Sequence, residues 1–157
     1  MFGVALAWPD ESASRNPWPP SRTAGFVLSI TLVKGNDLSF GQLFVGPSPG
    51  TCVVTPLGTR SSTGGVQLGG GSGVGPASFT VGGDVLATYS ITLPGSATMT
   101  NGGSSMTVNT FTSEPSGTGQ LDALGNQALS VGATLHVGAV QAPGTYSGTF
   151  DVTVAYN

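Results

Sequence analysis

The residues that could do catalytic chemistry in this sequence follow the pattern of a serine hydrolase. Gly46–Gly50 reads GPSPG, which matches the G-x-S-x-G pattern of a nucleophile elbow around Ser48. Asp84 or Asp122 and then His136 follow in the order Ser, Asp, His. This is the chain order of the triad in α/β-hydrolases.

Two features of the chain oppose a hydrolase. The oxyanion hole of that arrangement uses the backbone N–H of the residue after the serine, and Pro49 has none. The elbow must also lead into a helix, whereas the following TCVVTP has the composition of a strand. We therefore interpret residues 46–50 as a turn and predict that the protein is not an enzyme.

The sequence predicts neither a metal nor a cofactor site. His136 is the only histidine and alternates with an apolar set, so we expect it on the exposed face of a strand. A transition-metal site would need a second His or Cys beside it. The glycine-rich residues 69–75 lack the Lys-Ser/Thr of a phosphate-binding loop. Aspartates are scattered singly, without the spacing of a calcium loop, at Asp37, Asp84, Asp122 and Asp151.

The composition favours an all-β, extracellular protein. Charged residues are 7% of the 157 residues, against about 25% in typical soluble domains. Glycine, serine and threonine are abundant instead, which suits strands and turns better than exposed helices. The net charge is −3, so we predict no nucleic-acid partner. No apolar run is long enough for a membrane span.

Cys52 is the only cysteine and shares a strand face with Val54. We interpret it as a small buried hydrophobic residue, with an intermolecular disulfide as the alternative.

The sequence divides into two parts. Residues 1–23 form an N-terminal extension, with an apolar segment at 1–8 and a proline-rich linker at 9–23. Residues 24–157 then alternate between strands and turns, which predicts a β-sandwich of immunoglobulin-like type with nine or ten short strands. In GFVLSITLVKG both faces are largely apolar, which predicts a strand buried on two sides. The Asn-Gly-Gly at 101–103 predicts a β-hairpin, and NQALSVGATLHVG predicts a long strand.

The series of segments from about Ala24 to Asn157 resembles a bacterial family described as domain of unknown function 4402. The segments that carry the resemblance are DLSFGQLFVG, GTCVVTPLGTRSSTGGVQLGG, ASFTVGG, ATYSITLP, MTVNTFTS and the closing GQLDALGNQALSVGATLHVGAVQAPGTYSGTFDVTVAYN. The last of these is also similar to the end of spore coat protein U-like domains, which are similar to pilus subunits of archaic chaperone–usher systems.

The resemblance implies a secreted protein at the bacterial surface that forms fibres or adheres, without enzyme activity. It also implies a periplasmic chaperone and an usher as partners, and self-association by exchange of a strand. Two features depart from the related pilins. One cysteine cannot supply their disulfide, and a full signal peptide is missing.

Both ends of the chain carry an alternating apolar segment. The closing GTYSGTFDVTVAYN predicts a half-buried strand whose apolar face is the candidate contact for a chaperone or another subunit. That face consists of Tyr146, Phe150, Val152, Val154 and Tyr156. At the other end large residues alternate with glycine and alanine, which suits a donor strand, in Phe2, Val4, Leu6 and Trp8. The competing interpretation is the remainder of a secretory leader, since Ala5-Leu6-Ala7 resembles a cleavage site.

These observations lead to two main hypotheses of different kinds. The first is a structural surface subunit, pilus-like, that assembles by β-strand complementation. The second is a monomeric secreted adhesin, or binding module, that uses the loops at the ends of its sandwich. Exposed aromatic residues such as Trp18 or Phe111 would favour the second hypothesis.

Overall fold

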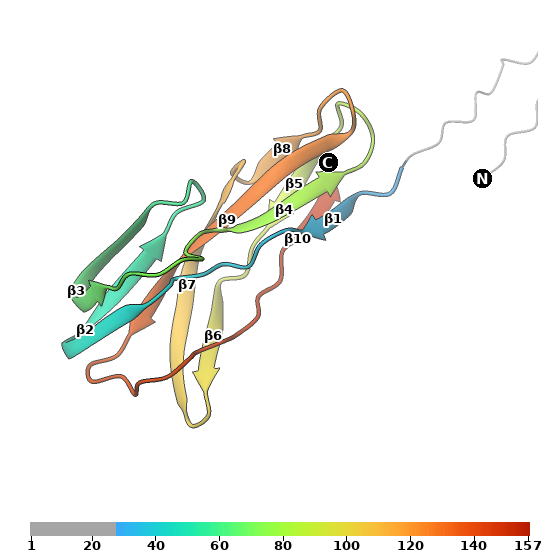
Figure 1. Ribbon diagram of the computed structural model, residues 1–157. Helices are drawn as coiled ribbons and strands as arrows, with labels where there is room; N and C mark the ends of the chain where they lie inside the picture. Colours follow the sequence, from blue (N-terminus) through green and yellow to red (C-terminus); the bar gives the residue numbers. More distant parts are fainter. Residues whose placement is uncertain (1–27) are drawn as a thin grey trace, which may run out of the picture.

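In the computed structural model of the protein, residues 28–157 are described, and all regular elements among them are β-strands (Figure 1). The strands form two antiparallel sheets that share a core, so the predicted all-β sandwich is confirmed. Their bounds are β1 (Thr31–Lys34), β2 (Leu43–Val54), β3 (Arg60–Leu68), β4 (Ala77–Gly82), β5 (Thr88–Thr92), β6 (Ser96–Asn101), β7 (Ser104–Glu114), β8 (Thr118–Gln120), β9 (Asn126–Val137) and β10 (Thr153–Tyr156).

The larger sheet is built around β9. One edge of β9 pairs with β7, and the other edge is shared by β4 along its first half and β2 along its second half. The two neighbours meet at Gly132, between the pairs Ala77↔Val131 and Val54↔Ala133. A Cβ atom at Gly132 would collide with the carbonyl oxygen of Val54, so a residue without a side chain lets both strands reach β9.

The smaller sheet has the order β10-β5-β8. The chain passes from β5 into β6 through residues 93–95, and from β7 into β8 through residues 115–117, so both connections cross between the sheets. Among the described residues the two sheets are not paired with each other, so each has edge strands of its own. The first strand, β1, is an edge of the larger sheet, and the last strand, β10, is an edge of the smaller one.

Two clusters of buried side chains form the core. One surrounds Cys52, Val54 and Leu135, and the other surrounds Tyr89, Leu129 and Val131. Leu38 and Phe111 pack against both clusters and join them. Cys52 is fully buried and free, as its place beside Val54 in the sequence predicts.

Several local predictions are confirmed. Residues 101–103 make the turn of the β6–β7 hairpin, in which Asn101 pairs with Ser104 and Gly102 has φ 59°. NQALSVGATLHV is β9, in which the predicted alternating apolar set from Leu129 to Val137 is buried and His136 is exposed.

The turn predicted at residues 46–50 is wrong. β2 continues through this segment, and its register against β3 shifts between Val45 and Gly50. Pro47 and Pro49 have no N–H to donate, and an irregular stretch of a strand tolerates them because its ladder is already interrupted.

The strand predicted to be buried on two sides is also wrong, because β1 is an edge strand that pairs only with β4 among the described residues. Val33 is exposed on it, and Leu28, which precedes it, is exposed as well.

The closing strand is shorter than predicted. Regular pairing covers only Thr153–Tyr156, and a single bridge joins Ser147 to Thr100 on β6.

Candidate functional site

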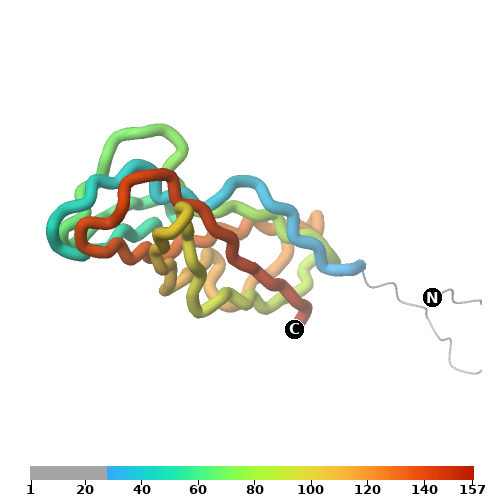
Figure 2. The backbone as a smooth tube through the Cα atoms, turned by 90° about the horizontal axis from the view of Figure 1, so that it is seen from below, coloured from blue at the N-terminus to red at the C-terminus, as the bar shows by residue number. Residues whose placement is uncertain are grey.

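The most distinctive feature of the surface is an apolar groove between the first and last segments of the described chain. The segments 28–40 and 147–156, which we call its two walls, run along the same side of the body (Figure 2). The pocket between them is lined by residues of 34–40 on one side and of 148–150 on the other. Within residues 28–157, β1 has only β4 as a partner and β10 has only β5. One edge of each strand therefore keeps its backbone N–H and C=O groups without a strand partner.

The C-terminal wall is held by two neighbours in succession. Thr100 and Ser147 exchange two backbone hydrogen bonds of 2.8 and 3.1 Å, and farther along Val154 pairs with Ile91. From Phe150 to Tyr156, alternate residues of this wall are half-buried against the core and the residues between them are exposed. The half-buried residues are the predicted contact residues Phe150, Val152, Val154 and Tyr156. Tyr146, the fifth predicted contact residue, is half-buried in the loop before this wall and bonds to Gln141 and Ala142 there.

One end of the groove is closed by Tyr156. Its hydroxyl group accepts a hydrogen bond of 2.7 Å from the backbone N–H of Asp84 and donates one of 2.9 Å to the carbonyl oxygen of Leu28. The carboxylate of Asp84 in turn accepts the N–H of Leu28 at 2.9 Å. This network ties β10, the β4–β5 turn and the start of β1 together, and so it sets the separation of the two walls.

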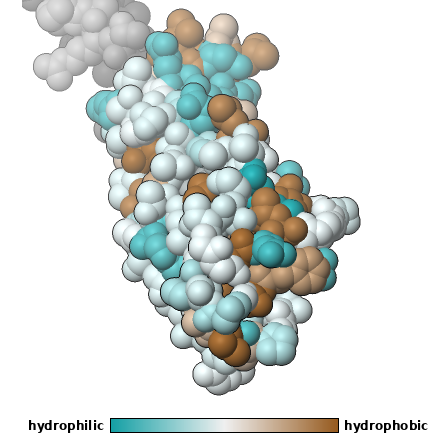
Figure 3. Space-filling model, turned by 90° about the vertical axis from the view of Figure 1, so that its left-hand side faces the viewer, coloured by the Kyte–Doolittle hydropathy of each residue, from teal (hydrophilic) through white to brown (hydrophobic). Residues whose placement is uncertain are grey.

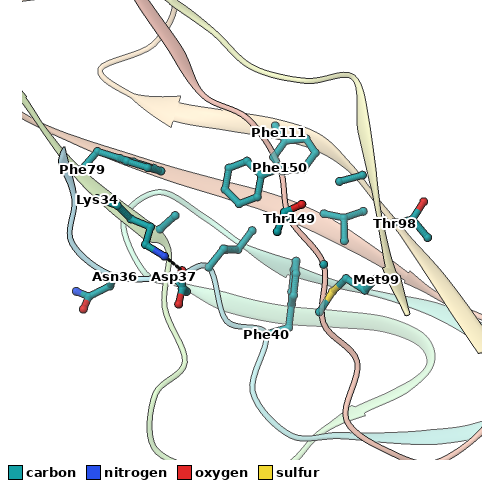
Figure 4. Close-up of a pocket in the computed structure, with 15 residues that line it drawn as sticks. Lys34, Asn36, Asp37, Phe40, Phe79, Thr98, Met99, Phe111, Thr149 and Phe150 are labelled. Atoms are coloured by element: carbon teal, nitrogen blue, oxygen red, sulfur yellow. Dashed lines mark hydrogen bonds and ion pairs between the residues drawn. The ribbon is translucent and has the colours of Figure 1, made fainter. Parts of the chain in front are cut away.

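At its other end the groove widens into an apolar pocket of about 200 Å³ (Figure 4). Aromatic and thioether side chains line it, including Phe40, Phe79, Met99, Phe111 and Phe150. The rings of Phe111 and Phe150 lie 5.0 Å apart between centroids with an interplanar angle of 37°.

A single ion pair lies at the mouth of this pocket. Nζ of Lys34 is 2.7 Å from a carboxylate oxygen of Asp37, and both side chains are mostly exposed. The site is therefore apolar inside and has one compensated charge pair at its rim, which suits an apolar side chain better than a charged ligand.

No hydrogen bond joins the groups of the hydrolase pattern, all of them in the described chain, to one another, although His136 lines a shallow pocket with Pro49, the neighbour of Ser48. Ser48 is exposed in the irregular stretch of β2, while the carboxylate of Asp84 binds Leu28. The carboxylate of Asp122 binds the N–H groups of Leu124 and Asn126, and Nε2 of His136 lies 2.8 Å from Oδ1 of Asn109.

The remaining reactive groups do not form a site either. In the described part of the chain there is no cluster of three or more metal-binding side chains and no helix that could cross a membrane. Burial raises the pKa of the Cys52 thiol, and the positive charge of Arg60 only partly opposes this. The thiol is therefore a poor nucleophile in the folded protein.

Some predicted residues lie outside the described chain. These are the candidate donor strand Phe2, Val4, Leu6 and Trp8, the linker at 9–23, and Trp18. Phe111, suggested above as an exposed aromatic, instead packs into the core beside the pocket.

Sequence reasoning missed the pocket itself. Its lining comes from segments far apart in the chain, such as Phe40, Phe79 and Met99. Each of these is an ordinary inward-facing residue of its own segment, so no local pattern distinguishes them.

The fold and the groove define a β-sandwich in which β1 and β10 each keep one edge without a strand partner among the described residues. The chain belongs to the family described as domain of unknown function DUF4402, whose model matches residues 30–156. The matched span includes residues 30–40 of the first wall and all of the second. No curated protein and no solved structure gives a significant match to the chain.

Proposed function

We propose that this protein is a non-enzymatic structural subunit of a bacterial surface fibre, which assembles by β-strand complementation. An extended segment of another copy adds to the free edges of β1 and β10 and fills the groove between them. The observation that carries this proposal is that β1 is an edge of one sheet and β10 an edge of the other, with an apolar pocket between the end of β1 and the segment that leads into β10. One added strand would satisfy both edges and cover that pocket.

The segment that best suits the groove is Phe2–Trp8 of a second copy. Its large side chains alternate with glycine and alanine, so one face would enter the groove and the other would leave room for the walls. A strand of this length spans about 23 Å. The ten or so residues of the C-terminal wall span about 33 Å, so the segment fits within it.

An apolar groove that is open to water is unfavourable, so the proposal includes partners that cover it before assembly. Until the strand of another copy arrives, a periplasmic chaperone would cover the groove, and an usher would guide the exchange. Secretion to the cell surface belongs to the same proposal, and the low content of charged residues supports it.

Point variants of the full chain test the proposal. Strand insertion buries many backbone hydrogen bonds, so wild-type multimers should survive unheated SDS gels. Val4→Asp together with Leu6→Asp should abolish these bands, because each places a charge in the apolar groove. Gly3→Ser together with Ala5→Ser, on the opposite face of the segment, should leave them in place.

A wild-type protein that stays monomeric on these gels and in size-exclusion chromatography would contradict strand complementation. The monomeric adhesin that binds through its end loops would then be the better account.

A further inference from the structure

Exposed apolar side chains gather at the two opposite ends of the elongated body. The first group, which we call the tip surface, lies beside the start of β1 and consists of Leu28, Val85, Leu86 and Leu124. The second group, the far-end surface, lies where β2 begins and β3 ends and consists of Val45, Leu68 and Val140. Val45 and Leu68 share one face of the β2–β3 ladder. Figure 1 shows these regions at opposite ends of the body. Figure 3, which faces the side of β2 and β3, shows hydrophobic residues gathered there among polar ones.

The tip surface is built from two turns that hold each other. Leu86 donates its N–H to the carbonyl oxygen of Asp122 at 3.2 Å, and Gly83 donates to Gly125 at 2.9 Å. Leu124, at the crest of the second turn, is 83% exposed. The turns are thus fixed by hydrogen bonds while their apolar side chains point into water, where polar residues are the usual choice.

Each end also contains a residue in a disfavoured backbone conformation. Leu86 at the tip has φ 59°, and Val140 at the far end has φ 50°. Side chains with a Cβ rarely adopt such angles, and β-branched ones least of all, while glycine adopts them freely. Val140 is nevertheless 77% exposed, and its N–H bonds to the carbonyl oxygen of Gly46. Packing in the core of the same molecule therefore does not explain why a leucine and a valine occupy these two positions.

We propose that the tip surface of one copy packs against the far-end surface of the next copy, so that the bodies join head to tail. Two different surfaces at opposite ends of one molecule extend an assembly indefinitely instead of closing a dimer. Leu28, within the tip surface, is also the residue through which residues 1–27 connect to the described body. This inference deepens the proposed function and rests on it for the identity of the partner.

The charges near the tip favour a protein partner over a membrane. The only ionisable groups in its two turns are Asp84 and Asp122, and backbone N–H groups hydrogen-bond both carboxylates. Neither turn offers a lysine or arginine to bind anionic lipid headgroups. The far-end residues Val45, Leu68 and Val140 are likewise uncharged, so the two surfaces match in character.

The test separates body contacts from strand exchange by using the full chain with Val4→Asp and Leu6→Asp. In this background, sedimentation at increasing protein concentration should still show self-association. Adding Leu86→Asp or Val140→Asp should raise the dissociation constant of that association by at least about tenfold, because the new carboxylate would lose its water in an apolar contact. Leu57→Asp changes a leucine that is equally exposed but lies in the β2–β3 turn, outside both surfaces, and should have no effect.

Mixing the two variants tests the head-to-tail arrangement directly. The Leu86→Asp chain keeps an intact far end, and the Val140→Asp chain keeps an intact tip. An equimolar mixture should therefore form dimers, although each variant alone is monomeric. Loss of association with Leu86→Asp but not with Val140→Asp would indicate tip-to-tip pairing and would overturn the proposal.

Glycine variants guard against a trivial loss of folding. Leu86→Gly and Val140→Gly should keep or raise the melting temperature, since glycine suits these angles, and should still weaken association.

Two further results would overturn the proposal. One is a background chain that stays monomeric at every concentration. The other is a monomeric chain that co-sediments with phosphatidylcholine vesicles only while Leu86 is present, which would assign the tip to a bilayer. Failure of strand exchange is read separately, from the absence of SDS-resistant bands in the chain with an unaltered N-terminus.

Discussion

The hydroxyl group of Tyr156, the penultimate residue, donates a hydrogen bond of 2.9 Å to the carbonyl oxygen of Leu28, where the described chain begins. The hydroxyl oxygen of Tyr156 also accepts a hydrogen bond of 2.7 Å from the backbone N–H of Asp84. One side chain thus joins the last strand, the first strand and the turn between β4 and β5. Because it spans the groove at one end, it sets how far apart the two free edges lie.

Replacing Tyr156 with phenylalanine removes both hydrogen bonds and keeps the ring. We expect the free energy of unfolding to fall by about 1–2 kcal/mol in urea titrations. Hydrogen exchange of the Asp84 amide should become faster. Tyr146→Phe is the matched control, because the Tyr146 hydroxyl bonds only to Gln141 and Ala142 in its own loop. An equal loss of stability in both variants would contradict the bridging role.

Arg60 fixes the loops that precede β2 and follow β3. Its guanidinium donates to the carbonyl oxygens of Phe40 at 2.9 Å, Gln42 at 3.4 Å and Gly69 at 2.6 Å. Arg60→Ala should lower the free energy of unfolding by about 2–3 kcal/mol, since charged donors are lost from partly buried acceptors. Arg60→Lys should recover little, because an ammonium group cannot span the three oxygens.

The comparison for Arg60 is Lys34, the other cation of the described chain, whose ion pair with Asp37 is exposed. Lys34→Ala should change the free energy of unfolding by less than about 1 kcal/mol. A Lys34→Ala variant as unstable as Arg60→Ala would show that charge, and not the bonds to the carbonyl oxygens, is responsible.

The stability should fall at alkaline pH because of Tyr89. Burial raises the pKa of Tyr89 above its ordinary value of 10.0. As the pH rises, the unfolded chain therefore releases the phenolic proton before the folded protein does. The contribution to stability is complete below the ordinary pKa of 10.0 and is lost as the pH rises toward the higher pKa of the folded protein. Urea titrations from neutral to strongly alkaline pH measure this decrease.

The variant Tyr89→Phe should reduce the alkaline decrease. At neutral pH the free energy of unfolding should fall by about 1 kcal/mol, because the variant lacks the hydroxyl group that donates a 2.7 Å hydrogen bond to Gln127. An unchanged pH dependence in Tyr89→Phe would assign the alkaline loss to another group.

The thiol of Cys52 should report on unfolding. The residue has no exposed surface, and burial raises its pKa, so little reactive thiolate forms in the native protein. A thiol-specific reagent should label the folded chain at least about a hundred times more slowly than the chain in concentrated urea. Rapid labelling of the native protein would contradict the burial of Cys52. A labelling rate that rises in the Arg60→Ala variant would show that the thiol becomes accessible when the loops held by Arg60 open.

Local pattern predicted much of the secondary structure because the information lay within each segment. The period-2 alternation of NQALSVGATLHV assigns the two faces of β9, and two glycines after Asn101 permit a tight hairpin. Family resemblance, which rests on the order of many such segments, agrees with the matched span of residues 30–156.

The errors arose where a neighbour overrides local preference. Gly46–Gly50 has the residues of a turn, but β3 lies alongside and the segment continues as an irregular part of β2. The strand around Leu32 has the apolar residues of a central strand, yet the fold places it at an edge.

The sequence by itself determined the all-β class, the low charge, the faces of the longer strands and the place of Cys52 in the core. Only the tertiary structure decided that β9 is shared by β4 and β2, and that Leu28 and Tyr156 meet across a groove. The physical reason is that alternation specifies which side of a strand is apolar but not which strand pairs with it. Pairing depends on contacts between distant segments, such as the room that Gly132 leaves for Val54, and these exist only when the whole chain has folded.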